Sequence, residues 1–343
     1  MTDTSTDKCI PNNCKLLRKT DLEPCFWINE HVHTGYRPPH LSTMQYVKWI
    51  FQWNNETINI WTHLIGFFYF TWRQYTTNVY FLPATNANPT DYIIISACLF
   101  GLQICMLLST FYHVFGAINA EQRRRFLRLD TFGISAGLIS IYLLGIYTAF
   151  LCFEKIKVTI IDHSFDFIFV AVSLSNVPYL ILIVINIMEW QNHYFAFLFG
   201  ISLVAVYLPL SNNIRKVVLF GSPFKCTHLI YLTIVTLGFG PTIHWIFLHG
   251  GISSEHVMEW LPNLFVLYAT SGSAFLFYIS MFPERLKPGV FDLVGYSHQW
   301  WHLLIFIAMW YWQNSMLDYL ATHRLDSNYC LISNRLSNIT SAT

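Results

Sequence analysis

Long apolar stretches alternate with short polar or turn-rich joints along most of this chain. The hydrocarbon core of a bilayer is about 30 Å thick, and about 20 helical residues cross it. Stretches of about this length occupy residues 58–81, 92–115, 131–151, 165–188, 194–211, 226–248, 263–282 and 298–317. Because backbone amides in hydrocarbon must find partners within the chain, this pattern predicts membrane-spanning α-helices.

A shorter amphipathic stretch precedes the first candidate span. In LSTMQYVKWIFQW, the apolar residues Leu41, Met44, Val47 and Phe51 recur at helical spacing, with aromatic residues between them. This arrangement predicts a short helix that lies in the membrane interface. The alternative is an ordinary polar lead-in whose aromatic residues fall there by chance.

Composition favours a membrane protein over a soluble one. Apolar residues make up 54% of the chain and charged residues only 11%, whereas a soluble domain carries about 25% charged residues. The net charge of +1 gives no indication of a nucleic-acid partner. The eight cysteines form no CxxC pair, so neither a zinc ribbon nor a disulfide framework is expected. The polar N-terminus lacks the apolar core of a signal peptide.

The basic residues predict the orientation in the membrane. The N-terminal region is rich in Lys and Arg, and the 116–130 joint carries Arg123, Arg124, Arg125 and Arg128, whereas the 82–91 and 249–262 joints carry none. Basic residues concentrate on the cytosolic side, so the N-terminus is expected there. The predicted parts are a cytosolic N-terminal tail (1–40), an interfacial helix (41–56), a membrane domain (57–318) and an extracytosolic C-terminal tail (319–343).

The hydrophobic segment 156–189 conflicts with the rest of the pattern. If it crosses the bilayer, His113 and His298 lie on opposite faces, about 30 Å apart; without it, seven spans place them on the same face. Pro178 near its centre interrupts helical hydrogen bonding. We therefore expect that this segment does not cross as one straight helix, and a true spanning helix is the alternative.

Polar residues then gather at one predicted membrane depth. Ser109 and His113 share a helix face, as do His298 and His302, and Asp130 begins the third span. Three neutral imidazoles plus a water are the ligand set of a catalytic zinc site, and Asp130 could accept a proton from that water. Alternatively, the histidine pair is a packed, hydrogen-bonded pair, and His113 with Asp130 is a plain buried ion pair.

Five motifs resemble the progestin and adipoQ receptor family in order and spacing. They are NNETINIWTHLIG (54–66), STFYH (109–113), LDTFGI (129–134), FPERLKPGVFD (282–292) and SHQWWH (297–302), and the likeness covers about residues 35–320 apart from 156–189. The resemblance implies an all-α membrane protein. Its fold would be a seven-transmembrane helix bundle of adiponectin-receptor type, inverted relative to G-protein-coupled receptors, to which 156–189 is an extra hydrophobic segment.

The resemblance also implies residue roles. His113, His298 and His302 would be the zinc ligands, Asp130 would hold the zinc-bound water, and Ser109 would complete an SxxxH motif.

A further polar set lies on one side of the first span and belongs to the first motif. It comprises Glu56, Asn59, Thr62 and His63. These residues either form a second shell around the zinc ligands or bond to neighbouring helices.

Three functions follow from the resemblance. The first is a Golgi membrane scaffold that holds a Raf-type kinase through its cytosolic N-terminal region and dampens MAP kinase signalling. The second is a zinc-dependent, ceramidase-like hydrolase of a lipid amide, with ceramide or a fatty acid as ligand. The third is a surface receptor for an adiponectin-like or steroid ligand. For all three the N-terminus is expected to be cytosolic and the C-terminus extracytosolic, which means lumenal for a Golgi protein.

Overall fold

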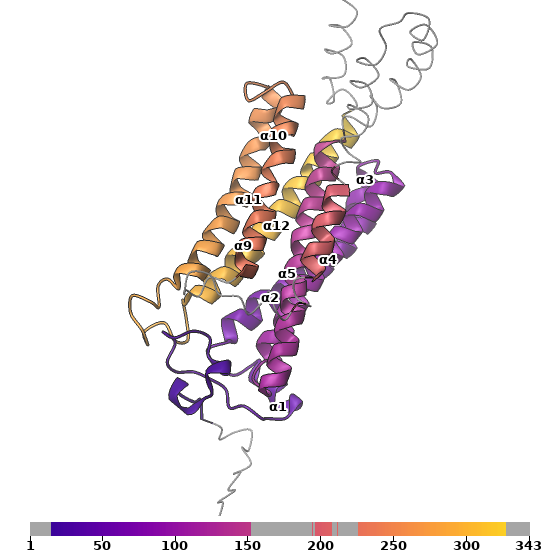
Figure 1. The fold of residues 1–343 in the computed structure, drawn as a ribbon. Coiled ribbons are helices and arrows are strands. Elements are labelled where there is room, and N and C mark those ends of the chain that lie inside the picture. Colours follow the sequence, from indigo (N-terminus) through magenta and orange to yellow (C-terminus); the bar gives the residue numbers. More distant parts are fainter. Residues whose placement is uncertain (1–14, 152–193, 195, 208–210, 212–225, 327–343) are drawn as a thin grey trace, which may run out of the picture.

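The computed structural model describes residues 15–151, 194, 196–207, 211 and 226–326. This part of the chain is a bundle of long helices with a folded N-terminal segment packed on one end (Figure 1). Its only β-pairing is an isolated bridge between Leu17 and Tyr36.

The helices have the following bounds. The elements are η1 (Lys19–Asp21), η2 (Pro24–Phe26), α1 (Thr43–Trp49), α2 (Thr57–Thr76), the π-turn η3 (Thr77–Phe81), α3 (Leu82–Ala84), α4 (Pro89–Phe115), α5 (Ala120–Ala149), α9 (Cys226–Leu237), α10 (Phe239–Leu248), α11 (Glu255–Ser280) and α12 (Ser297–Leu325). A further apolar helix covers Ala196–Tyr207. Within the described ranges, seven helical passes therefore form the bundle: α2 with η3, α4, α5, Ala196–Tyr207, α9 with α10, α11 and α12.

Short joints make neighbouring helices antiparallel. We call the end of the bundle where α2, α5 and α12 begin and α4 ends the α1 end, and the opposite end the α3 end (Figure 1). Ser135 on α5 donates its hydroxyl to the carbonyl oxygen of Ala205 at 2.7 Å and lies 2.8 Å from the Tyr231 hydroxyl. The Ala196–Tyr207 helix and α9 thus pack on the same side of α5.

Four helical stretches are long and apolar enough to cross a bilayer by length and composition. They are Pro89–Phe115, Ala120–Ala149, Cys226–Leu248 and Glu255–Ser280. The helices α2 and α12 have the length but more polar sequences, because they carry Asn59, His63, His298 and His302 among their apolar residues. The helices α2 and α12 therefore bring polar groups into the bundle, as α4 does with Ser109 and His113 and α5 does with Asp130.

Segment 156–189 lies outside the described residues, and the nearest described residues on either side of it are Leu151 and Tyr194. The rings of Phe150 and Tyr194 stack with their centroids 5.2 Å apart, and both lie at the α3 end, where Tyr194 also contacts His244 of α10. The described chain therefore leaves and returns at the same end of the bundle.

Several helices are longer than the apolar pattern predicts. The helix α5 begins at Ala120 rather than at 131, because Asn119 caps it by accepting from the Gln122 amide at 2.8 Å and the arginines that follow are good helix formers. Its 30 residues span about 45 Å, more than the hydrocarbon layer needs. Similarly, α12 continues to Leu325, into the region expected to be a tail.

Residues 15–40, expected to be a tail, fold back onto the α1 end. Val32 and Tyr36 form a small buried core with Tyr296. The loop between α11 and α12 holds this segment through two buried carboxylates: Glu284 accepts from the Asn29 amide at 2.8 Å, and Asp292 accepts from the Thr34 hydroxyl at 2.7 Å. The N-terminal segment is therefore part of the structure that surrounds the candidate site.

A short helix, α1, lies within residues 41–56, where an interfacial helix was predicted. Ser42 caps it through a reciprocal bond with Gln45. Tyr46 and Trp49 are buried, whereas Met44 and Phe51 expose 65% and 75% of their surface. An exposed apolar face beside a membrane bundle fits a helix that lies in the interface.

The α3 end carries an ion pair between a buried carboxylate and a half-buried arginine. Arg324, in the last turn of α12, donates to both carboxylate oxygens of Asp91, in the first turn of α4, at 2.9 Å each. The Tyr147 hydroxyl of α5 donates to the same carboxylate at 2.6 Å. These bonds join three helices at the end opposite the histidines.

Candidate metal centre

Three histidines meet at the α1 end. His113 lies in the last turn of α4, and His298 and His302 lie in the first two turns of α12. Their ligand atoms all lie within 4.8 Å of one another, and theirs is the one such group among the described residues. His113 and His302 are buried and His298 is half-buried. The spacing of the two pairs along the sequence therefore brings all three predicted ligands together.

The ring nitrogens have the separations that a tetrahedral metal requires. The Nε2 atom of His298 lies 3.4 Å from Nε2 of His113 and 3.1 Å from Nε2 of His302. Two nitrogens bound to zinc at about 2.0–2.1 Å in a tetrahedron are about 3.3 Å apart. The donor set of three imidazoles therefore fits Zn²⁺, with a fourth position left for water or substrate.

Glu56 fixes the orientation of the first histidine. Its Oε2 atom lies 2.8 Å from Nδ1 of His113, which leaves Nε2 to point at the other rings. Glu56 also accepts from the Asn59 amide at 2.6 Å, and Asn59 in turn contacts the Tyr296 hydroxyl at 2.6 Å. A carboxylate on the far nitrogen of a metal-binding histidine fixes the tautomer and makes the imidazole a stronger ligand.

Arg37 anchors the end of α4 that carries His113. Its guanidinium donates to the carbonyl oxygen of Val114 at 2.9 Å and to that of His113. These carbonyls lie in the last turn of the helix, where they lack intrahelical partners and the helix dipole is negative. Burial lowers the pKa of Arg37, and the nearby Glu56 carboxylate opposes this effect. The contact ties the folded N-terminal segment to the first histidine.

The two predicted catalytic residues face the same space. Ser109 is buried one turn before His113 on α4, and Asp130 is half-buried on α5. The Asp130 carboxyl interacts with the Ser109 hydroxyl and with His113. A carboxylate, a hydroxyl and three imidazoles thus line one end of a shared cavity.

The four polar residues of the first motif do not all face the histidines. Glu56 and Asn59 form the contacts described above, and the ring of His63 packs on that of His302 with centroids 4.0 Å apart. Thr62 instead donates to the carbonyl oxygens of Ile58 and Asn59 on its own helix, at 2.7 and 3.1 Å. The structure therefore places Glu56 and His63 against the histidines, holds Asn59 against Glu56, and directs Thr62 to the α2 backbone.

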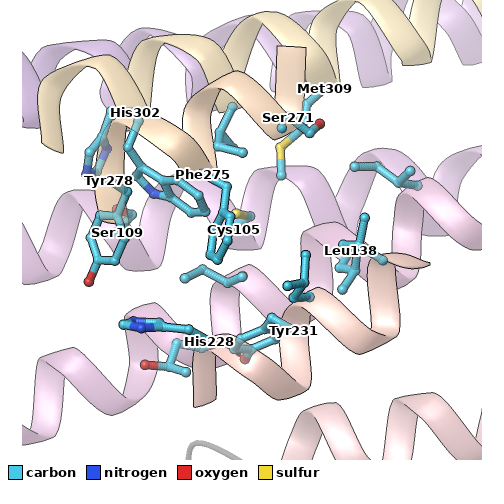
Figure 2. A pocket seen from close by; sticks show the side chains of 18 of the residues that line it. Cys105, Ser109, Leu138, His228, Tyr231, Ser271, Phe275, Tyr278, His302 and Met309 are labelled. Carbon is cyan, nitrogen blue, oxygen red and sulfur yellow. Dashed lines mark hydrogen bonds between the residues drawn. The ribbon is translucent and has the colours of Figure 1, made fainter. Parts of the chain in front are cut away.

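The cavity that holds these groups measures about 1200 Å³. In Figure 2, His302, Tyr278 and Ser109 lie together at one end, whereas Leu138 and Met309 line the other. The apolar end and the volume suit an acyl chain, and the polar end suits a head group.

Several residues of this site were not singled out from the sequence. Glu284 accepts from the backbone amide and the hydroxyl of Ser297, and so caps the helix that presents His298. Tyr278 of α11 lines the cavity with its ring 5.7 Å from that of His298. The motif FPERLKPGVFD contains Glu284, but nothing in the sequence shows which helix end it caps.

The fold and the site together define a helical membrane protein with a three-histidine centre at one end of its bundle. The haemolysin-III-related family matches residues 51–313 of the chain. The protein named "Progestin and adipoQ receptor family member 3" is 31% identical in Mus musculus over 312 residues, which are 89% of this chain and 86% of that protein; its Homo sapiens counterpart is 30% identical over the same shares. The chain belongs to the haemolysin-III-related proteins and, among them, to the progestin and adipoQ receptor family.

A more distant relative is the "Adiponectin receptor protein" of Drosophila melanogaster, 26% identical over 89% of this chain and 59% of that protein. The predictions of the family and of an all-α membrane bundle are thereby confirmed. The metal, the Golgi location and the partners stay predictions.

Proposed function

We propose that the chain is a zinc-dependent hydrolase of lipid amides that works at the α1 end of its bundle. The observation that carries the proposal is the meeting of His113, His298 and His302 with Asp130 at one end of a cavity of about 1200 Å³. Zinc held by three histidines activates water near neutral pH and polarises a carbonyl oxygen.

The side chains have distinct roles in this proposal. The three imidazoles hold the metal, and Glu56 keeps His113 oriented. Asp130 accepts the proton of the attacking water and passes it to the amide nitrogen as the C–N bond breaks. Ser109 positions that carboxylate. The apolar wall, with Leu138 and Met309, takes the acyl chain of ceramide or a similar lipid, so a fatty acid is the expected product.

The decisive experiment measures zinc content and ceramide hydrolysis on the same purified samples. Wild type should carry about one zinc per chain and release fatty acid. Asp130→Asn should keep its zinc and lose at least about 100-fold in turnover. The control His244→Ala removes another half-buried histidine, which does not line the cavity, and should keep both properties. A wild type that binds zinc but hydrolyses no lipid amide would make the centre structural.

A second candidate function is a Golgi scaffold for a Raf-type kinase. Similarity to "Progestin and adipoQ receptor family member 3" over 89% of the chain supports it, as does a folded N-terminal segment with exposed charged residues such as Arg18 and Glu23. On this proposal the α1 end faces the cytosol and the protein dampens MAP kinase signalling. Residues 15–34 contribute to the fold, so the test is to delete 1–14 or reverse the charge of Arg18 and measure kinase co-purification from Golgi membranes. Unchanged recruitment in both variants would argue against this surface.

A receptor for an adiponectin-like or steroid ligand has less support. It needs a binding face at the α3 end, where the joint between α10 and α11 covers only 249–254.

A further inference from the structure

The first turns of α5 carry an unusual concentration of positive charge. Arg123, Arg124, Arg125 and Arg128 follow closely on the start of the helix at Ala120. A helix N-terminus is already the positive end of the helix dipole, so cations there are destabilising and anions are attracted. Among the described residues, neither Arg123 nor Arg124 forms an ion pair with a carboxylate.

Two of these arginines line the cavity that contains the histidines. They are Arg123, which is half-buried, and Arg124, which is exposed, whereas the exposed Arg125 does not line it. Since Arg124 and Glu30 are exposed and line the cavity too, the cavity reaches the surface beside this basic group. Part of the positive charge, on Arg123 and Arg124, therefore lies at the cavity entrance, and Arg125 adds charge on the outer surface.

The carboxylates that line the same cavity already have other partners. Glu30 lies 3.5 Å from Nε2 of His31, Glu56 binds His113, and Asp130 interacts with Ser109. The contacts of Arg123 are two long bonds of 3.4 Å to the carbonyl oxygens of Gly116 and Trp27. A guanidinium has five N–H donors, so both arginines retain donors for an anionic ligand.

The basic group lies close to the metal centre. The guanidinium of Arg123 lies 5.3 Å from the ring centroid of Tyr112, and the rings of Tyr112 and His113 are 4.9 Å apart. The ring of Tyr112 therefore lies between the Arg123 guanidinium and the ring of His113.

We propose that the ligand is an N-acyl lipid with a phosphate ester two carbons from its amide nitrogen. The phosphate would bind Arg123 and Arg124 while the amide lies at the histidines. The N–C–C–O–P path is roughly 5 Å long. Together with the length of a guanidinium–phosphate contact, it is of the same order as the two successive contacts that lead from Arg123 through the Tyr112 ring to His113. Arginine forks bind phosphate with paired, charge-assisted hydrogen bonds. An uncharged lipid such as ceramide leaves both arginines without an anion.

The amide position in this ligand rests on the proposed hydrolase function. In the reaction, one water supplies hydroxyl to the acyl carbon and hydrogen to the nitrogen, so the C–N bond breaks and a fatty acid and an amine are released. The phosphate ester stays intact on the amine product.

The test compares ceramide 1-phosphate with ceramide on the full chain in nanodiscs of neutral lipid. Wild type should bind the phosphorylated lipid at least about 10-fold more tightly. Arg124→Gln should remove that preference, whereas Arg125→Gln, which removes an equal charge from the same helix outside the cavity, should keep it within about twofold. Arg123→Lys, which keeps the charge but not the fork, should weaken it.

Because the test measures lipid affinity, it can succeed or fail independently of the proposed hydrolysis. Asp130→Asn should retain the preference for the phosphorylated lipid even if no sample hydrolyses either lipid. Equal affinity of wild type for the two lipids would overturn the proposal. It would also be overturned if Arg125→Gln lost the preference as fully as Arg124→Gln, because the charge would then act through the membrane surface only.

Discussion

The Oε2 atom of Glu56 lies 2.8 Å from Nδ1 of His113, although the residues belong to different helices and are 57 positions apart. Glu56 is the N-cap residue of α2, and His113 lies in the last turn of α4. The contact directs the remaining nitrogen of His113 towards His298. It links the first motif of the chain to the candidate metal centre.

This contact predicts that Glu56 sets metal affinity without binding metal. Glu56→Gln should weaken zinc binding by roughly 10–100-fold, because the imidazole loses its charged partner. Competition with a chromophoric zinc chelator measures the change. Glu121→Gln, an exposed glutamate in the first turn of α5, is the matched control. Equal zinc affinity in all three proteins would show that Glu56 only packs against α4.

Metal removal should lower the thermal stability of the wild type. Zinc bound to the native state alone stabilises it by mass action, so a strong chelator should lower Tm. His298→Ala should lose most of its zinc, and chelator should then leave its Tm unchanged. His228→Ala should respond to chelator like wild type. Full zinc occupancy in His298→Ala would remove His298 from the site.

The ion pair at the α3 end should affect stability and leave the metal centre unchanged. Asp91→Asn leaves the half-buried Arg324 guanidinium without its anion, which should cost about 2–3 kcal/mol, less than for a fully buried pair. Tyr147→Phe removes one hydrogen bond to the same carboxylate and should cost about 1 kcal/mol. Zinc content should not change in either variant. Chemical denaturation tests this, with the exposed Asp318→Asn as control; a wild-type unfolding free energy in Asp91→Asn would contradict the prediction.

The sequence predicts the helices and the two pairs on helix faces, Ser109 with His113 and His298 with His302, because both depend on local spacing. His298 and His302 are four residues apart, so they share one face of α12 however the helices pack. His113 lies near them because, with seven passes, the end of α4 and the start of α12 are on the same side of the bundle. Contacts that depend on the packing of distant segments could not be predicted in this way. Nothing in the local pattern shows that Glu284 caps α12 or that Arg37 reaches the carbonyl oxygens of α4.

The Arg-rich stretch illustrates the same limit. Its charge predicts the side of the membrane, but a polar joint and a helical extension have the same composition. Only the structure shows that Arg124 lines the cavity while Arg125 does not. The direction of Thr62 likewise depends on its rotamer rather than on its place in the motif.

The last prediction concerns topology. The α1 end and the end of α12 at Leu325 lie at opposite ends of the bundle, and Phe150 meets Tyr194 on either side of the extra segment. An odd number of crossings is therefore expected, with a cytosolic N-terminus and an extracytosolic C-terminus. A tag placed after residue 343 should resist protease in intact membrane vesicles whose cytosolic face is outward, while a tag before residue 1 is digested.

Glycosylation provides an independent readout of the same topology. The sequon Asn338-Ile339-Thr340 should be glycosylated, and Asn338→Gln should abolish the mobility shift that an endoglycosidase produces. Asn55 of the other sequon is buried, and its backbone carbonyl oxygen accepts a hydrogen bond from the Tyr296 hydroxyl. Asn55 should therefore stay unglycosylated. If both terminal tags are digested in sealed vesicles and Asn338 carries no glycan, the number of crossings is even. His113 and His298 would then face opposite sides of the membrane, and the three-histidine centre could not form.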